Sequence, residues 1–419
     1  MTRRFSAFEL FRAGMAGQKT WTRHWRDPEP KSHYDVVIVG GGGHGLATAY
    51  YLAAVHGVRS VAVLERAWIG GGNTGRNTTI VRSNYRLPQL QRLLEFSLKT
   101  WETLGETLNY NLMFSQRGAV FLGHSDADMA KLAERGDSLR CAGIDADLMT
   151  RAQVAVRIPG LDMSPDARFP IVGGLVQERG GTARHDAVAW GYARAADRLG
   201  VDIIQNCEVT GFDIVGGAVR GVMTSRGKIG AGRIGVCVAG SSGLVMGLAG
   251  LKLPIESHLL QAFVSEPVKP MIDTVIMSQS IHCYISQSDK GEIVLGGDPD
   301  HYPTYSQRGS PHRLEDVAAQ AIALVPALSR LRMLRAWAGT TDMSFDGSPI
   351  IGATPVDGLY LNGGWCYGGF KATPGSGRVF AHHLATGAPH EIAAPFSLDR
   401  FAAGATIDEA GSGPAPQSR

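Results

Sequence analysis

The chain has 419 residues, more than one compact core usually contains, so its length predicts two domains. Hydrophobic residues make up 44%, which excludes a disordered chain, and 41 basic against 38 acidic residues without a long single-sign block disfavour a nucleic-acid partner. The 54 glycines are nearly twice the usual share of about 7% and are typical of an α/β enzyme with tight turns.

The cysteine pattern and the apolar stretches predict a cytoplasmic protein. Five cysteines without a CxxC pair indicate neither structural zinc nor a disulfide framework. The N-terminal stretch lacks the apolar core of a secretory signal, and Glu9 with few serines disfavours a mitochondrial transit peptide. The uncharged stretch 234–251 contains enough glycine and serine to predict a strand, a turn and a helix start rather than a membrane span.

The predicted elements begin after an N-terminal arm, residues 1–33. The arm carries aromatic side chains that indicate a subunit contact, namely Phe5, Phe8, Phe11, Trp21 and Trp25. Residues 34–66 then read as strand, helix and strand: YDVVIVG and VRSVAVLER are apolar runs, and the segment between them has helical spacing and ends at Gly57. Farther along, the pattern predicts helices at 87–107, 127–137 and 186–200, a buried strand at 233–240, and an antiparallel sheet within 255–335.

A glycine-rich turn joins the first strand of this unit to its helix. Gly40, Gly42 and Gly45 form the pattern GxGxxG, in which missing side chains let the backbone approach a pyrophosphate at a helix N-terminus. Glu65 ends the second strand, 20 residues after Gly45, where a carboxylate accepts hydrogen bonds from a ribose. The unit therefore predicts a dinucleotide site, and the acidic residue disfavours the 2′-phosphate of NADP.

Two later glycine loops favour FAD over NAD. WIGGGNTGRNTTIVRSNYR follows Glu65 and is too long and polar for the next crossover of a simple nicotinamide domain. GGWCYGGFKATPGSG, near the end of the chain, precedes a predicted helix whose N-terminus can face the flavin or a substrate anion. Each loop alone is equally consistent with ordinary turn structure.

Several long blocks carry a family resemblance that runs from about residue 20 to about residue 408. The chain resembles the β subunits of heterotetrameric sarcosine oxidases, within the glycine oxidase and D-amino-acid oxidase class of flavoproteins, in VIVGGGGHGLATAYYLA, GGNTGRNTTIVRSNY, FSQRGAVFL, ARHDAVAWGYARAADRLGVDIIQNCEVTGF, ESHLLQAFVSEP, SQSDKGEIVLGG and GGFKATPGSG.

The resemblance implies an α/β fold with a Rossmann-like FAD-binding domain and a second, antiparallel-sheet substrate domain. We assign 34–110, 155–250 and 340–403 to the FAD-binding domain, 111–154 and 251–339 to the substrate domain, and 404–419 to a disordered tail. The resemblance also implies a complex with α, γ and δ subunits, noncovalent FAD, and covalent FMN on this chain. NAD and a tetrahydrofolate site are expected on a partner subunit.

The resemblance also assigns site residues. His185 matches the histidine that attaches FMN, and its place before a predicted helix favours a neutral imidazole, although an isolated RHD is as easily a surface helix start. The other cofactor-binding positions are Gly40, Gly42, Gly43, His44, Gly45, Glu65, Asn73, Thr74, Thr78, Thr79, Ile80, Val209, Gly369 and Lys371.

Arg82 and Lys371 are the candidate catalytic residues. A sarcosine-like substrate carries a carboxylate, which a guanidinium and a second cation hold well in a buried site. Arg82 follows the first flavin loop and Lys371 lies in the last glycine loop, so the predicted fold can bring both to one flavin face. An isolated arginine is more often a solvated surface charge.

Two stretches depart from the family pattern on the expected substrate side: Trp365 to Lys371 and Gly296 to Tyr302. Within them, Asp298 and His301 could act as acid or base but also fit a turn, and Cys366 could be a reactive thiol but also a packing residue. His382 and His383 have no spacing that indicates a metal site.

We expect oxidative demethylation of sarcosine or a related N-methyl amino acid, with hydride passing to FAD and electrons passing to FMN and oxygen. The expected products are hydrogen peroxide and formaldehyde or methylenetetrahydrofolate. Two alternatives stay open at this point: a proline- or opine-type amine dehydrogenase with another electron acceptor, and a non-catalytic FAD-bearing subunit.

Overall fold

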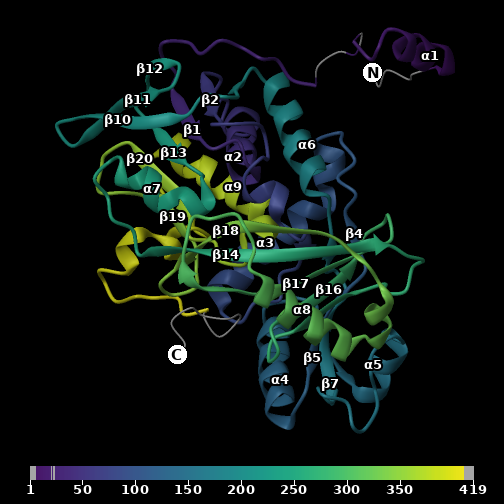
Figure 1. Ribbon diagram of the computed structural model, residues 1–419. Helices are drawn as coiled ribbons and strands as arrows, with labels where there is room; N and C mark the ends of the chain where they lie inside the picture. Colours follow the sequence, from purple (N-terminus) through teal and green to yellow (C-terminus); the bar gives the residue numbers. More distant parts are fainter. Residues whose placement is uncertain (1–5, 20, 22–23, 410–419) are drawn as a thin grey trace.

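The computed structural model describes residues 6–19, 21 and 24–409, and one of its two large layers is a six-stranded sheet (Figure 1). Neighbouring strands are parallel except for the last pair, β20 and β19. In spatial order the strands are β9 (Asp202–Ile204), β2 (Val61–Leu64), β1 (Val36–Val39), β13 (Ile234–Val236), β20 (Leu359–Gly363) and β19 (Ile350–Ala353). The two strands predicted within 34–66 are confirmed, and both are buried along their whole length.

Alternate residues of β1 face two hydrophobic cores. Val36 and Ile38 pack into the core formed with the helices α2 (Gly43–Ala54), α3 (Pro88–Thr107), α6 (His185–Arg198) and α9 (Gly369–Thr386). Val37 and Val39 face the core beneath β10 (Val209–Val215), β11 (Ala218–Thr224), β12 (Gly227–Gly230) and α7 (Ser242–Gly247). The helices predicted at 87–107 and 186–200 are confirmed as α3 and α6.

The second layer is an eight-stranded sheet whose neighbours are antiparallel except for the parallel pair β15 and β5. Its spatial order is β18 (Met333–Ser344), β14 (Ile255–Pro267), β17 (Glu292–Pro303), β16 (Cys283–Gln287), β15 (Val275–Ser278), β5 (Ala119–Gly123), β7 (Gly173–Gln177) and β6 (Asp147–Thr150). Helices α5 (Arg151–Arg157) and α8 (Pro311–Leu324) pack with one core of this sheet, and α4 (Asp126–Cys141) packs with another.

The chain also forms smaller elements beside the two large sheets. A three-stranded sheet joins β3 (Ile80–Val81), β8 (Gly181–Thr182) and β4 (Ser115–Gln116). The short 3-10 helices are η1 (Asn73–Arg76), η2 (Ala239–Ser241), η3 (Pro326–Arg330), η4 (Ala394–Phe396) and η5 (Leu398–Arg400). The uncharged stretch 234–251 folds as β13, η2 and α7, which confirms the predicted strand, turn and helix start.

Two predicted boundaries are wrong. Strand β7 lies within 155–250, which we assigned to the FAD-binding domain, yet it pairs with β5 and β6 in the second sheet. The second is the tail: 404–409, which we assigned to a disordered end, is placed in the fold, with Ile407 and Glu409 buried, and the rest of that segment, 410–419, lies outside the described residues. Both errors come from contacts distant in sequence, which composition does not reveal.

The N-terminal arm has two parts. Helix α1 (Ala7–Met15) stands apart from the rest of the chain in Figure 1, and its Phe8 and Phe11 are exposed. Trp25, which we predicted in a partner surface, instead packs against the core of α2, α3, α6 and α9. Phe5 lies outside the described residues. Within the part of the chain that the structure describes, no helix has the length and apolar character that a membrane crossing requires.

Candidate active site

A cavity of about 620 Å³ lies between the two sheets, at the carboxyl ends of β1 and β2. Its lining comes from the glycine loops, from β14 and β18, and from the ends of β15 and β16. Of the predicted site residues, all but Gly45 and His185 line it: Gly40, Gly42, Gly43, His44, Glu65, Asn73, Thr74, Thr78, Thr79, Ile80, Arg82, Val209, Gly369 and Lys371. Residues from Gly40 to Lys371, 331 positions apart in sequence (371 − 40), thus meet at one site.

The first glycine loop needs glycine for three separate reasons. Gly40 has φ +109° and lies so close to Cys237 that a Cβ would be 2.3 Å from its carbonyl oxygen. A Cβ on Gly45 would be 2.0 Å from the carbonyl oxygen of Gly40, so Gly45 supports the turn without lining the cavity. Gly42 caps α2 without a side chain, which leaves backbone at the helix N-terminus facing the cavity.

Glu65 is fixed where β2 ends. Its carboxylate accepts hydrogen bonds from the N–H of Gly41 at 2.8 Å and of Ala67 at 2.9 Å. These bonds hold the carboxylate beside the glycine loop, and Glu65 lines the cavity near Val209. The position is the one that a ribose-binding carboxylate takes next to a glycine-rich turn.

The second glycine loop closes over the first. Thr74 Oγ1 accepts a hydrogen bond from the N–H of Gly43 at 2.9 Å, and Asn73 Nδ2 donates to the carbonyl of Thr340 at 2.5 Å. Thr79 has φ +68°, and its N–H donates to Asn77 Oδ1 at 2.7 Å. A β-branched residue in this conformation is strained, and it persists here because the surrounding bonds determine the backbone.

His44 lies in the first turn of α2, stacked on Trp365 with ring centroids 4.9 Å apart. Its Nδ1 is 2.5 Å from the hydroxyl of Ser376. Burial lowers the pKa of His44 to about 4, so the imidazole is neutral at pH 7. A neutral ring at a helix N-terminus leaves the favourable field there for an anion.

The cavity ends in a group of buried cations around aromatic rings. The guanidinium carbon of Arg82 lies 4.4 Å from the ring centre of Tyr85 and 5.0 Å from that of Phe121. Lys371 Nζ is 5.9 Å from the ring centre of Tyr85 and donates to the carbonyl of Tyr367 at 2.7 Å. Both cations are only 7% exposed.

The two cations affect each other. Burial, and then the nearby Arg82 charge, lowers the pKa of Lys371 well below 10.5. An anion bound between them would relieve both effects, because buried charges are normally paired. The structure thus brings Arg82 and Lys371 together at the Tyr85 ring, as the sequence predicts.

Sequence reasoning missed four residues that line this site or support it. Tyr85 is three residues from Arg82, so adjacency could have indicated it, whereas Phe121, Tyr284 and Asp342 come from separate strands without a local signal. Burial raises the pKa of Asp342 to about 6, while its carboxylate accepts the N–H of Gly364 at 2.6 Å.

The two stretches that depart from the family pattern, 296–302 and 365–371, have specific structural roles. Asp298 and His301 lie within β17, so the turn that we considered for them is wrong. Asp298 pairs with His282, which lines the cavity, at 2.8 Å. Cys366 lines the cavity, and burial raises the pKa of its thiol to about 12, so the thiol is protonated at neutral pH and weakly nucleophilic.

His185 is the first residue of α6, away from the main cavity. Its Nδ1 is buried without a hydrogen-bond partner. Burial is the largest cause that lowers its pKa, and the Arg184 and Arg335 charges lower it further, whereas Asp186 opposes them. The ring is therefore a neutral, partly buried nitrogen base, on which the positive charges of Arg184 and Arg335 act.

The residues at the cavity fit a flavin dinucleotide. Backbone faces the cavity at Gly42 and Gly43, a carboxylate is fixed at Glu65, and a pair of cations lies at the other end. No group of three or more His, Cys, Asp or Glu side chains in the described part of the chain could hold a metal ion.

Comparisons with known proteins agree with this arrangement. The FAD dependent oxidoreductase family matches residues 35–383. The chain is 58% identical to the sarcosine oxidase subunit beta of Rhizobium meliloti (strain 1021), over 99% of both chains, and 50% identical to that of an Arthrobacter species, over 93% and 96%. Among solved structures, L-proline dehydrogenase from P. horikoshii superposes with a TM-score of 0.83 at 26% identity, over 90% of this chain and 99% of that one. Glycine oxidase from Geobacillus kaustophilus, at 21% identity and a TM-score of 0.79, shares the fold over 88% and 99%.

Proposed function

We propose that the chain oxidatively demethylates sarcosine or a closely related N-methyl amino acid. The reason is that it belongs to the FAD dependent oxidoreductase family and, within that family, to the β subunits of sarcosine oxidase. Its family makes it an FAD-dependent amine oxidoreductase. The observation that carries the choice of substrate is the pair of buried cations, Arg82 and Lys371, at one end of a cavity whose other end has a dinucleotide cradle.

The protein's part in the reaction is to bind, orient and exclude water. Arg82 and Lys371 would hold the substrate carboxylate, which anchors a small amino acid by its one constant charge. Tyr85, Phe121 and Trp365 are buried and would keep water from the N-methyl carbon.

FAD, when bound, supplies the acceptor for the hydride that leaves the N-methyl carbon of the neutral amine. The resulting substrate iminium is then hydrolysed to formaldehyde and the demethylated amine, or captured by tetrahydrofolate on a partner subunit.

The residues that would hold FAD are the predicted cofactor set. Glu65 would bind the adenosine ribose, the α2 N-terminus and Gly43 would face the pyrophosphate, and the loop from Asn73 to Ile80 would line the flavin. Val209 would contact the adenine, and Gly369 with Lys371 would lie beside the isoalloxazine.

Reduction of the flavin by a panel of amines tests the proposed substrate. Anaerobic sarcosine should bleach the flavin absorbance of the purified protein. A second candidate, an amine dehydrogenase acting on proline, is favoured by the fold likeness to L-proline dehydrogenase. Bleaching by proline or an opine but not by sarcosine would support that candidate, and bleaching by no amine would indicate a non-catalytic FAD-bearing subunit.

We extend the proposal to a covalent FMN on His185, which supplies the site where oxygen is reduced to hydrogen peroxide. Support comes from the unpartnered, buried Nδ1 of His185, and from the positive charges of Arg184 and Arg335, which act on the ring although Arg184 is paired with Asp186. Denaturing electrophoresis under ultraviolet light should show flavin fluorescence on the wild-type chain and none on His185→Asn. Fluorescence that persists in the variant would contradict the attachment.

The remaining expectations concern assembly. The proposed partners are α, γ and δ subunits, with NAD and tetrahydrofolate on one of them and the assembly in the cytoplasm. Helix α1 offers a contact surface, because Phe8, Phe11 and Met15 are each at least two-thirds exposed, from 67% to 77%. Removing residues 1–18 leaves Trp25 and the Arg26 pair with Asp197 in place. It should preserve FAD but prevent co-purification of the large subunit; an intact assembly after this truncation would contradict the contact.

A further inference from the structure

The loop between β3 and α3, residues 82–87, carries both Arg82 and Tyr85 and has no regular secondary structure of its own. Its backbone N–H groups therefore need partners from elsewhere in the fold. Two side chains that are distant in sequence supply partners for most of them, one for the first half of the loop and one for the second, while the N–H of Tyr85 donates to the carbonyl of Ser83 within the loop. These contacts decide where the Arg82 guanidinium lies.

Gln177, the last residue of β7, holds the first half of the loop and is completely buried. Its Oε1 accepts hydrogen bonds from the N–H of Ser83 at 2.9 Å and of Asn84 at 3.2 Å. Asn84 Oδ1 in turn accepts from Arg82 Nη1 at 2.9 Å. The chain of contacts from Gln177 to the Arg82 head is thus three residues long.

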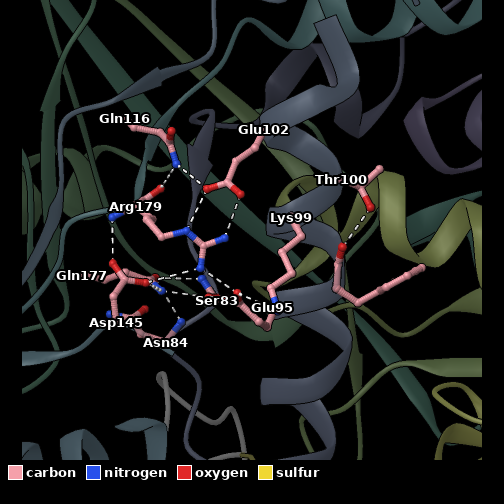
Figure 2. Close-up of polar contacts among 11 residues, drawn as sticks. Ser83, Asn84, Glu95, Lys99, Thr100, Glu102, Gln116, Asp145, Gln177 and Arg179 are labelled. Carbon is pink, nitrogen blue, oxygen red and sulfur yellow. Dashed lines mark hydrogen bonds and ion pairs between the residues drawn. The ribbon is translucent and has the colours of Figure 1, made fainter. Parts of the chain in front are cut away.

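Figure 2 shows that Gln177 is itself held by a polar network that reaches α3. Its Nε2 donates to Ser83 Oγ at 2.8 Å and to Asp145 Oδ1 at 3.1 Å. Ser83 Oγ donates to Glu95 at 2.7 Å, and Arg179 donates to Glu95 at 2.6 Å. Because each member has two or more partners, the amide of Gln177 has one orientation that satisfies the network.

Glu409 holds the second half of the loop and is 3% exposed. Its carboxylate accepts the N–H of Arg86 at 2.6 Å and of Leu87 at 2.9 Å, at the N-terminus of α3, where a negative charge is favourable. The segment before Glu409 is anchored by Asp346, which pairs with Arg400 at 2.8 Å and accepts the N–H of Ile407.

We infer that Gln177 and Glu409 are positioning residues that hold the 82–87 loop from both sides and so present Arg82 to the substrate carboxylate. This inference rests on the proposed function, in which Arg82 binds that carboxylate. Neither residue lines the cavity, so each acts through the loop and not on the substrate.

The test is a double-mutant cycle with Gln177→Met and Arg82→Met, in the FAD-loaded full chain with whatever subunits co-purify. The ligand is methoxyacetate, which keeps the sarcosine carboxylate but has an ether oxygen in place of the amine and cannot be oxidised in the same way. Its Kd is read from the perturbed flavin spectrum, beside FAD content and the unfolding midpoint.

We expect Gln177→Met to raise the Kd roughly tenfold when Arg82 is present and to change it less than twofold in the Arg82→Met background. An unchanged Kd in Gln177→Met, or the same increase in both backgrounds, would overturn the inference while leaving the role of Arg82 intact. An unchanged Kd in Arg82→Met alone would instead refute that part of the proposed function, and the inference with it.

Gln287→Met is the matched control. Gln287 is also buried, and its Oε1 also accepts two backbone N–H groups, those of Met271 and Ile272, but it does not line the cavity. It should lower the unfolding midpoint about as much as Gln177→Met without changing the Kd. A shift of the Kd in this control as large as that in Gln177→Met would count against positioning.

A second variant covers the case in which Gln177→Met does not fold. Glu409→Gln keeps the side-chain size but replaces one acceptor oxygen with a donor, so one of the two loop N–H groups loses its partner. It should raise the Kd several-fold only when Arg82 is present, whereas Glu391→Gln, which removes an exposed partner of Arg92, should not. A wild-type Kd in Glu409→Gln would overturn the inference.

Discussion

The two ends of the cavity are built in different ways. At the nucleotide end the chain offers backbone: Gly40, Gly42 and Gly43 bring the main chain to the surface, and Glu65 is a fixed negative charge beside them. At the substrate end it offers charged and aromatic side chains, with Arg82 and Lys371 buried around Tyr85. A site built from backbone loses its ligand when a side-chain atom is added to a glycine. A site built from side chains loses its ligand when one of those side chains is shortened or loses its charge.

The largest effect should come from adding one methyl group at the nucleotide end. In Gly45→Ala the new Cβ would lie 2.0 Å from the carbonyl oxygen of Gly40, so the loop cannot keep its shape. We expect FAD content, measured by absorbance after gel filtration, to fall below about a tenth of wild type. Gly247→Ala is the control, since a Cβ there has nothing within 4 Å; equal FAD loss in both variants would mean a general loss of folding.

At the substrate end, replacing Arg82 should leave FAD bound but lower the affinity for the substrate. Truncating one partner of a buried, hydrogen-bonded charge pair costs about 2–5 kcal/mol, or roughly 30- to 5,000-fold in affinity. Arg82→Lys should be nearly as weak as Arg82→Met, because lysine keeps the charge but not the planar fork. The affinity is measured from anaerobic flavin-reduction rates at increasing sarcosine concentration. Wild-type rates in either variant would contradict the role of Arg82 at the substrate end.

Removing the Glu65 carboxylate at the nucleotide end should have a smaller effect. Glu65→Ala loses charge-assisted hydrogen bonds worth about 1.5–3 kcal/mol, so the Kd for FAD should rise roughly 10- to 150-fold. Titration of the apoprotein with FAD, followed by flavin fluorescence, gives the value. An unchanged Kd would show that the carboxylate only supports the glycine loop through Gly41 and Ala67.

The smallest effect is a pH dependence at the substrate end. Since the pKa of Lys371 lies well below 10.5, the lysine loses its proton at a lower pH than usual, and a carboxylate binds its protonated form. The affinity for methoxyacetate should therefore fall as the pH rises, from a lower pH than for an ordinary lysine, by at most about tenfold per pH unit. In Lys371→Met the affinity should be weaker at the low-pH end of the profile and independent of pH; a retained slope would assign it to another group.

The same contrast explains what the sequence could predict. The nucleotide end is local: Gly40, Gly45 and Glu65 lie within one strand-helix-strand unit, where spacing alone determines geometry. At the substrate end, Phe121 and Tyr284 lie on strands separated by more than 150 residues, and strand pairing brings them together without a local pattern. The order of the tail depends on Asp346 and Arg400 for the same reason.

The order of the strands has a consequence for how the protein acquires its cofactor. Strand β1 pairs with β13, β13 pairs with β20, and Thr373 of α9 packs against the place where a Cβ on Gly43 would lie. The turn at Gly40 is therefore among the first parts to be synthesised, and the parts that enclose it are among the last. At about 5–20 residues per second, translation leaves an interval on the order of tens of seconds between them. During that interval the apolar β1 and β2 have no complete sheet to join, so we expect flavin binding to be a late event of folding and the unfinished chain to be prone to aggregation until α9 has emerged.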